Sequence, residues 1–600
     1  MIIRRDPASS LTRRSLARRL VPAIPEIAFA LATTVIGVWA GGRWLDPTGD
    51  PGLWWSLASR IAEGERYFRD LHLQYGPLSP LLLAWSGKPF GFSSGFFLLV
   101  NWIPAIFAGV LLLRLARYWL TVPERCVLAV LLVAVSVLGP GRAKLVFPYC
   151  PAAVHGLIFA VAALLLMGRR DEKPPGPALA AGLLAGLAFA AKQEIGVAAL
   201  VALWVPLLTR ARGAVRWTVS TGVGFAVAAG ASLLYALSRA PLVSLAEESH
   251  FWPLAPTLPA PWRRLSRVAA GMGGTDWPVV LAETAGALLL YAGMFALAGL
   301  LFVRERERRR WMTPALLLAA LLIAEVVRGF PLYRGSAPAS LAFTMAGLLS
   351  LAGLLSPRLP HRDLLVGVGL FAGLVSLRSV FSGDLGGPYS GVAHFATALT
   401  ACVLLFRIVP EILPGGPGAR PVRLAWVALV LFWSLATLSL GLWDLRSAWR
   451  VAVPTNRGTV WMDSRQAALF HAVRSEASAG ERVFFVPETH GLDVLYDLKD
   501  ASPFLIHVPG WLDASAERKL LTSFERRPPD LVVRSERGTS EFGVRPFGQG
   551  YGILLSEWIS RRYQVVAAVP EAELLRPARA RPSALLQDEG RLAGQPSHGR

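Results

Sequence analysis

The chain has 600 residues, 54% of them hydrophobic, with a mean hydropathy of +0.46 and a net charge of +21. This is too apolar for a soluble enzyme of this length, and uncharged apolar stretches recur from Val21 to about Leu442, so the sequence predicts a polytopic α-helical protein of the lipid bilayer. The charge comes almost wholly from arginines in short loops, where it sets topology, so nucleic acid is not an expected partner.

In chain order, arginine-rich residues 1–20 are predicted to form a cytoplasmic tail. The first span, at about 21–41, has no small-residue cleavage site and is expected to be retained. About thirteen spans are predicted within a transmembrane domain at 21–444. The later apolar runs are 92–118, 125–140, 148–168, 176–191, 195–209, 216–237, 278–302, 312–328, 336–356, 363–381, 388–409 and 423–443. The segment Pro77–Trp85 is shorter, and we expect a loop that dips to the membrane interface.

Loop charge predicts the orientation. If the N-terminus is cytoplasmic, every second loop lies inside, and each of those loops is basic, as the positive-inside rule requires. Their basic residues include Arg114, Arg117, Arg125, Arg169, Arg170, Arg210, Arg212, Arg304, Arg306, Arg358, Arg362, Arg407 and Arg420. The outer loops are then 42–91, 238–277, 329–335 and 382–388, and the chain from 445 onward is periplasmic or extracellular. We expect a multi-pass protein of the plasma membrane.

After about residue 445 the composition changes, and short buried strands are predicted at 482–486, 531–535 and 564–569. Helices are predicted at 491–498, 515–526 and 553–562, so the sequence indicates a small extracytoplasmic α/β domain at 445–574. It contains no Gly-x-Gly-x-x-Gly turn, which leaves dinucleotide binding without support. The Arg, Pro, Ala, Gly and Ser mixture at 575–600 is predicted to be a disordered tail.

The first outer loop holds the most informative motifs. After the first span it carries Asp46-Pro-Thr-Gly-Asp50, then Ala58-x-x-Ile-x-x-Gly64, then Tyr67-x-x-Asp70 and Gly76-Pro-Leu78. This pattern resembles the first outer loop of the C-fold (GT-C) glycosyltransferases, in particular bacterial relatives of protein mannosyltransferases and of the lipid A aminoarabinose transferase. The resemblance implies a GT-C-like membrane domain in a bacterial inner (plasma) membrane, a polyprenyl-phosphate sugar donor and an extracytoplasmic acceptor.

The resemblance implies that the catalytic aspartate of this loop is Asp50, acting as a base toward the acceptor. Asp46 is a nearby competitor, and capping of the helix that begins at Pro51 is the alternative role for Asp50. Tyr67 and Asp70 match supporting positions of the family, although an extra residue separates them here and a solvated turn is the alternative for Asp70. No cofactor is certain; a divalent cation near Asp50 and His72 stays open.

Two cations are candidates for the donor phosphate. Lys192 follows an apolar run and resembles the family lysine at the outer end of a short span; the alternative is a lysine that snorkels to the interface. Arg334, in the predicted outer loop 329–335, can bind phosphate with paired donors. Tyr149 and Tyr333 resemble supporting aromatic positions of the family.

Two other classes of function are alternatives to a glycosyltransferase. A transporter or flippase for lipid-linked saccharides would place charges near the middle of the bilayer and repeat in two halves, and the sequence shows few such charges and no obvious halves. A non-catalytic scaffold for envelope assembly would tolerate loss of the Asp50 carboxylate. The sequence leaves open the sugar, the acceptor, the prenyl chain length, the oligomeric state and the role of the C-terminal domain.

Overall fold

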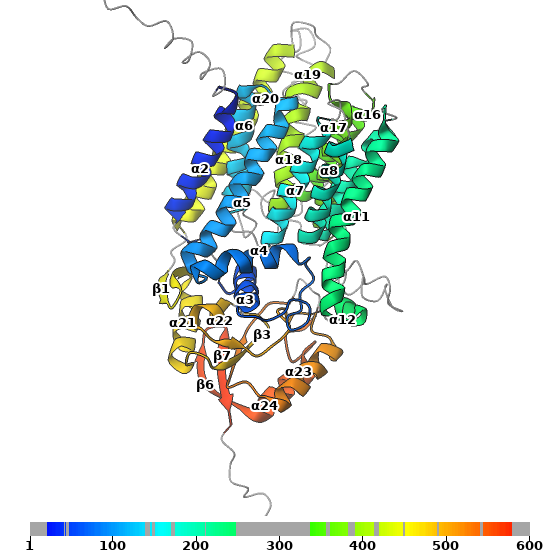
Figure 1. The fold of residues 1–600 in the computed structure, drawn as a ribbon. Helices are drawn as coiled ribbons and strands as arrows, with labels where there is room; N and C mark the ends of the chain where they lie inside the picture. The colour runs from blue at the N-terminus through cyan, green and yellow to red at the C-terminus, as the bar shows by residue number, and fades with distance from the viewer. Residues whose placement is uncertain are drawn as a thin grey trace, which may run out of the picture.

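The computed structural model describes residues 21–40, 42–43, 47–138, 145–146, 150–169, 175–209, 212–247, 337–355, 360–381, 390–412, 419–447, 451–488, 491–509, 511–539 and 544–578. A bundle of long apolar helices forms one part of the molecule, and the last strands and helices of the chain form a smaller part at one end of that bundle (Figure 1). Helices α3 (Asp50–Ala62) and α4 (Leu78–Gly87) lie between the two parts.

The predicted apolar runs are helical wherever the structure describes them. The bundle contains η1 (Val21–Ala23), α2 (Ile24–Ala40), α5 (Ser94–Leu115), η3 (Ala116–Tyr118), α6 (Val122–Leu132), η4 (Val133–Val137), α7 (Pro151–Met167), α8 (Pro175–Ala191), α9 (Gln193–Leu203), α10 (Val205–Leu208), α11 (Ala214–Arg239), α12 (Leu242–Glu247), α16 (Ala337–Leu355), α17 (Arg362–Phe381), α18 (Ser390–Val403), η8 (Leu404–Ile408), α19 (Val409–Ile412) and α20 (Ala419–Ser447). Two predicted spans, 278–302 and 312–328, lie outside the described residues.

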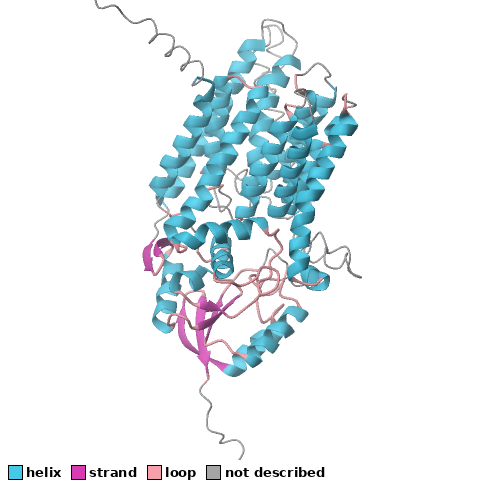
Figure 2. Ribbon diagram, in the orientation of Figure 1, coloured by secondary structure: helices cyan, strands magenta, loops and turns pink. Residues whose placement is uncertain are grey.

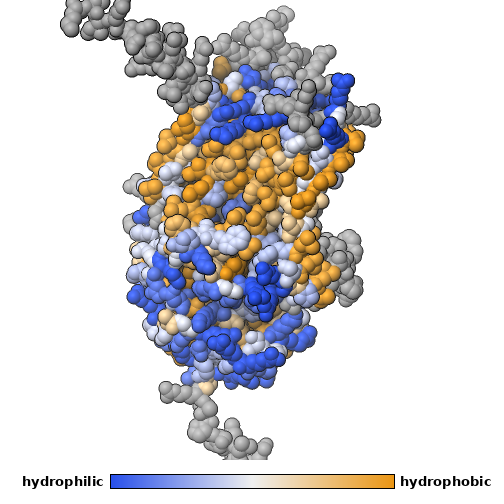
Figure 3. All heavy atoms as spheres, in the orientation of Figure 1, coloured by the Kyte–Doolittle hydropathy of each residue, from blue (hydrophilic) through white to orange (hydrophobic). Residues whose placement is uncertain are grey.

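Several helices have the length and the surface that a bilayer requires. Among the described residues, four stretches are long and apolar enough to cross a membrane: Val21–Ala40, Ser94–Tyr118, Ala214–Arg239 and Trp426–Trp443. Large apolar side chains on their outer faces are exposed, for example Val215, Val219 and Val223 of α11 at 51–70%. On the face that Figure 3 shows, apolar side chains cover the middle of the bundle between two polar ends, which is the surface that hydrocarbon covers. The number of thirteen spans stays a prediction.

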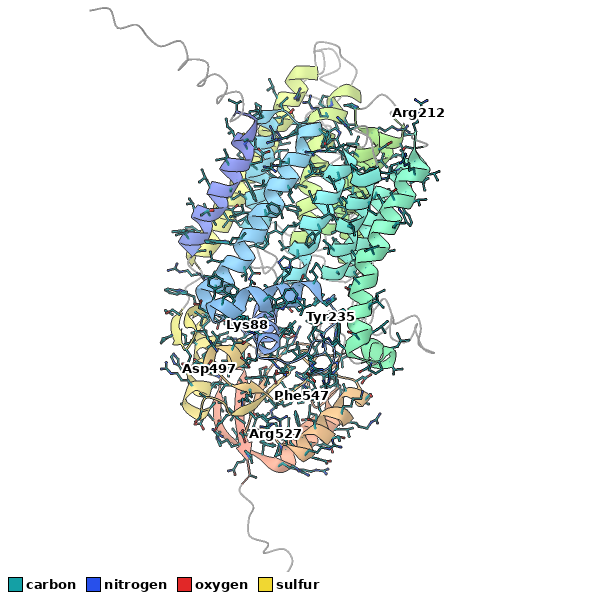
Figure 4. The ribbon with its side chains drawn as sticks, viewed as in Figure 1. Lys88, Arg212, Tyr235, Asp497, Arg527 and Phe547 are labelled. Atoms are coloured by element: carbon teal, nitrogen blue, oxygen red, sulfur yellow. The ribbon has the colours of Figure 1, made fainter. Side chains whose placement is uncertain are left out.

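The two ends of the bundle differ in charge and in what they carry. Arg212 lies at one end, whereas Tyr235 near the end of α11 lies at the other, beside α3, α4 and the C-terminal part (Figure 4). At the arginine-rich end, the buried Glu124 carboxylate pairs with Arg407 at 3.2 Å and also with Arg423. The first outer loop and the C-terminal part therefore share the opposite end, as the loop charges predicted. Which end faces the cytoplasm stays a prediction.

The segment predicted to be an interfacial loop at Pro77–Trp85 is instead helical. Helix α4 begins at Leu78, and its Ser79, Leu83 and Ala84 are buried against the neighbouring helices. Ten residues are too few to cross a bilayer, but packing of one apolar face against α3 and the bundle stabilises a helix of this length.

The C-terminal part is an α/β unit, shown by its strands in Figure 2. Strands β1 (Val451–Thr455) and β2 (Gly458–Met462) form an antiparallel hairpin that the sequence analysis missed. A five-stranded sheet has the order β4-β3-β5-β7-β6, in which β3 is parallel to β4 and β5, and β7 is antiparallel to β5 and β6. The remaining elements are α21 (Ser464–Glu476), β3 (Arg482–Val486), α22 (Gly491–Tyr496), β4 (Lys499–Asp500), α23 (Ala514–Arg526), β5 (Leu531–Ser535), α24 (Ile553–Arg562), β6 (Tyr563–Val569) and β7 (Ala572–Pro577).

The strands predicted at 482–486, 531–535 and 564–569 are confirmed, as are helices close to the predicted bounds. The tail predicted from 575 begins too early, because β7 continues to Pro577. Leu574 and Leu575 are buried in the sheet, and Arg576 pairs with Glu481 at 3.2 Å. The first residues of the predicted tail therefore form the end of a strand.

Candidate active site

Asp50 is the first residue of α3, at the end of the bundle that carries the C-terminal part. Gly49 has the extended backbone of the N-cap position. Asp50 is therefore the first helical residue and not the N-cap residue, which corrects the alternative role given to it from the sequence. An acidic residue in the first turn is favourable because it faces the positive end of the helix dipole, and the Asp50 side chain is exposed.

The rest of α3 is held rigidly by buried aromatic residues. The Trp55 indole donates to the main-chain oxygen of Phe92 at 3.0 Å, and its ring stacks on Phe97 with centroids 4.9 Å apart. Trp54 lies against the ring of Tyr75 at 5.1 Å. The start of α3 thus has a fixed position relative to the bundle, which is what a positioned catalytic group requires.

Lys192 is the single residue between α8 and α9, with an extended backbone (φ −146°, ψ 110°). It is only 2% exposed, so its side chain does not snorkel to the surface, and that alternative is wrong. Its Nζ lies 4.7 Å from the centroid of the Tyr75 ring, 3.4 Å from Glu194 Oε1 and 3.8 Å from Cys150 Sγ. The carboxylate of Glu194 and the aromatic face of Tyr75 are the kinds of partner that make a buried ammonium less costly.

Cys150 connects Lys192 with Asp50. The thiol is fully buried just before α7, and it is hydrogen-bonded to the side chain of Tyr75. Both the Lys192 ammonium and the Asp50 carboxylate interact electrostatically with it. Tyr75, Cys150 and Lys192 therefore contact one another, and Asp50 lies within electrostatic range of the thiol; we call these four residues the site cluster.

Tyr67 shapes the loop that presents Tyr75. It is fully buried, and its hydroxyl lies within hydrogen-bonding distance of the main-chain oxygens of Leu73 at 3.1 Å and Tyr75 at 2.8 Å. Burial, and then Cys150, raises the pKa of the Tyr67 hydroxyl well above its ordinary value, so it acts as a neutral donor. Tyr67 supports the site cluster by fixing backbone and does not enter it.

Asp70 lies outside the site cluster. Its carboxylate accepts a hydrogen bond from the main-chain nitrogen of Arg66 at 2.9 Å and pairs with Arg69 at 3.7 Å, and its side chain is 40% exposed. These contacts close a solvated turn. The alternative of a solvated turn therefore describes Asp70.

Four residues named from the sequence lie outside the described residues: Asp46, Tyr149, Tyr333 and Arg334. Within the described ranges, no three His, Cys, Asp or Glu side chains are grouped so as to hold a metal ion. His72 is turned to the C-terminal part instead, where its ring lies 5.2 Å from that of Phe504. The proposed roles of Arg334 and of a divalent cation stay predictions.

The sequence analysis missed Tyr75 and Cys150. The motif Gln74-Tyr-Gly-Pro77 held a signal for Tyr75 in its glycine. In the structure, a Cβ on Gly76 would lie 2.1 Å from the main-chain oxygen of Ala190. Only glycine lets the loop approach the end of α8 this closely, which brings Tyr75 next to Lys192. Nothing in the surroundings of Cys150 in the sequence distinguishes it from an ordinary buried cysteine.

No protein-family model matches the chain, and no curated protein matches it. Among solved structures, it is similar to ArnT from Cupriavidus metallidurans bound to undecaprenyl phosphate, with 14% identity and a TM-score of 0.40 over 92% of this chain and 98% of that one. The apo structure of the same protein gives 13% identity and a TM-score of 0.38 over the same shares. ArnT is the aminoarabinose transferase whose loop the motifs resemble. A likeness at this identity and TM-score does not define a function, which rests on the residues of this chain.

Proposed function

We propose that this chain is an integral-membrane glycosyltransferase that moves a sugar from a polyprenyl-phosphate donor to an extracytoplasmic acceptor. The observation that supports the proposal is a buried lysine, Lys192, 3.8 Å from the Cys150 thiol, with the exposed carboxylate of Asp50 within electrostatic range of the same thiol. A base open to solvent and a cation at membrane depth are the two groups that transfer from a lipid phosphate requires.

Each group has a distinct task in the transfer. Asp50 accepts the proton of the acceptor nucleophile while the nucleophile's electron pair forms the bond to the anomeric carbon. The bond between that carbon and the phosphate oxygen breaks, and its electron pair leaves on the polyprenyl phosphate. Lys192 offsets the charge that develops on this leaving group. Its ammonium has three donors, so it can bind a phosphate oxygen and keep its contact with Glu194.

The surface around the site cluster suits a donor with an apolar prenyl chain and a polar sugar phosphate. The exposed apolar faces of the bundle reach toward the end where α3 and α4 lie, so a prenyl chain could stay in hydrocarbon while its phosphate reaches Lys192 (Figure 3). The acceptor would approach from the polar side, where Asp50 is exposed and the C-terminal part lies. The protein would then work at the outer face of a bacterial inner membrane.

The test uses protein in lipid nanodiscs and a panel of polyprenyl-phosphate sugars, with transfer to added acceptors and slow donor hydrolysis as readouts. Asp50→Asn should lower turnover at least about a hundredfold, the usual loss for a general base, while still binding donor. Lys192→Met should weaken donor binding as well as turnover.

Asp70→Asn is the matched control, because it removes a carboxylate from the same loop at a place the site does not use. Turnover in the Asp70 variant should equal that of the native protein. Full turnover by Asp50→Asn, or no turnover by the native protein with any donor of the panel, would rule the proposal out.

A further inference from the structure

Gln74 is held from two sides by parts of the chain that are far apart in sequence. Its side-chain Oε1 accepts a hydrogen bond from the indole nitrogen of Trp511 at 2.6 Å, and its main-chain oxygen accepts one from Gln193 Nε2 at 3.1 Å. Trp511 belongs to the C-terminal part, and Gln193 follows Lys192 directly. One residue therefore connects the C-terminal part to the junction between α8 and α9.

The residues after Gln74 have little freedom to move independently. Tyr75 lies between the ring of Trp54, at 5.1 Å, and the Lys192 ammonium, at 4.7 Å. Gly76 packs against the main chain of Ala190 with no room for a Cβ. Because such a packed segment shifts as a unit, a displacement of Gln74 displaces the aromatic face that contacts Lys192.

The segment of the C-terminal part before Trp511 is docked on the same loop. The His72 main-chain nitrogen donates to the oxygen of Pro503 at 3.0 Å. Arg60 of α3 donates to the main-chain oxygen of Ser502 at 3.0 Å and pairs with Asp500 at 3.3 Å. Trp511 is thus presented to Gln74 by a surface that already binds both α3 and the loop that follows it.

We infer that the C-terminal part sets the affinity of the site for the donor's phosphate through the connection Trp511–Gln74–Gln193, which positions Tyr75 against Lys192. This inference rests on the proposed function, since it names what controls one substrate of that reaction. Trp511 and Gln74 are positioning residues: they touch neither substrate nor reacting atoms, and they act through Tyr75 and Lys192. The domain whose role the sequence left open would then be part of the donor site.

The experiment measures binding of undecaprenyl phosphate, without any sugar, to nanodisc protein. Trp511→Phe keeps the ring and removes the N–H, and Gln74→Met keeps the length and removes the acceptor. Each should raise the Kd about 3- to 10-fold, the range expected for one hydrogen bond. The double variant should be no weaker than either single variant, because both remove the same bond. The kcat at saturating donor should stay within about twofold, since one hydrogen bond used in positioning affects donor binding first.

Trp461→Phe is the matched control. Trp461 also joins the C-terminal part to the first outer loop, with its ring under the Arg43 guanidinium at 4.4 Å, and the connection Trp511–Gln74–Gln193 does not pass through it. Its Kd should equal that of the native protein. Unchanged binding by Trp511→Phe, an equal loss in Trp461→Phe, or losses that add in the double variant would overturn the inference alone. Failure of the native protein to bind undecaprenyl phosphate would overturn the proposed function together with it.

Discussion

Arg60 of α3 offers the sharpest test of how the first outer loop holds the C-terminal part. The residue is 8% exposed, and its guanidinium donates twice to Glu65, at 2.8 and 2.9 Å, and once to Asp500, at 3.3 Å. Burial opposes its charge, but Asp500 and then Glu65 outweigh burial, and the pKa of Arg60 is raised above its ordinary value. Arg60→Met keeps the aliphatic stem and removes the charge.

The cost of this change comes mainly from Asp500. The Asp500 side chain is fully buried, so without Arg60 its charge stays in a low-dielectric place, beside a second buried acid, Asp493. Removing one partner of a buried ion pair costs about 3–5 kcal/mol. Glu65 is 37% exposed and can be rehydrated, so it adds little. The double variant Arg60→Met with Asp500→Asn should recover much of the loss, because no buried charge is then left without a partner.

Native-state proteolysis of nanodisc protein measures this loss, because cleavage of a transiently opened state follows its population. A cost of 3 kcal/mol or more corresponds to cleavage that is faster by roughly a hundredfold or more. Arg465→Met is the control: Arg465 pairs with Glu571, but both side chains are more than half exposed, and such pairs contribute less than about 1 kcal/mol. An Arg60→Met rate close to the native one, or a double variant worse than the single, would refute the reasoning.

Three further changes test other parts of the structure. Gly76→Ala should destabilise the protein by about 1–3 kcal/mol and lower transfer, because the new Cβ meets the backbone of Ala190 at 2.1 Å; Gly95→Ala, in the first turn of α5 with nothing within 4 Å of the new Cβ, should not lower the melting temperature. Glu124→Gln should lower stability by about 2 kcal/mol, the scale of charged hydrogen bonds, without affecting donor binding, since Glu124 lies at the far end of the bundle; a changed Kd would contradict this. Burial, and then the nearby Asp500, raises the pKa of Asp493 well above its ordinary value. Its contribution to stability is therefore fully present below the unfolded-state pKa and is lost as the pH rises through the raised pKa. The variant Asp493→Asn should flatten this decline of the melting temperature with pH, and an unchanged slope would assign the decline to other groups.

The sequence by itself determined what depends on neighbours along the chain. Apolar runs predicted the helices of the bundle, and alternation of basic loops put Asp50 and Lys192 at the same end of it. Short β-branched and aromatic runs predicted β3, β5 and β6. These features follow from local periodicity and charge, which each segment carries whatever the rest of the chain does.

Only the tertiary structure decided which distant residues meet. The Ser56 hydroxyl donates to Asp493, and Trp511 to Gln74, each pair separated by 437 positions, and nothing local marks either pair. Helix α4 and the end of β7 likewise form because neighbouring elements of the packed molecule cover their apolar faces. The site cluster belongs to this second class: a buried lysine is tolerable only where Tyr75 and Glu194 surround it, and that surrounding is a property of the packed molecule.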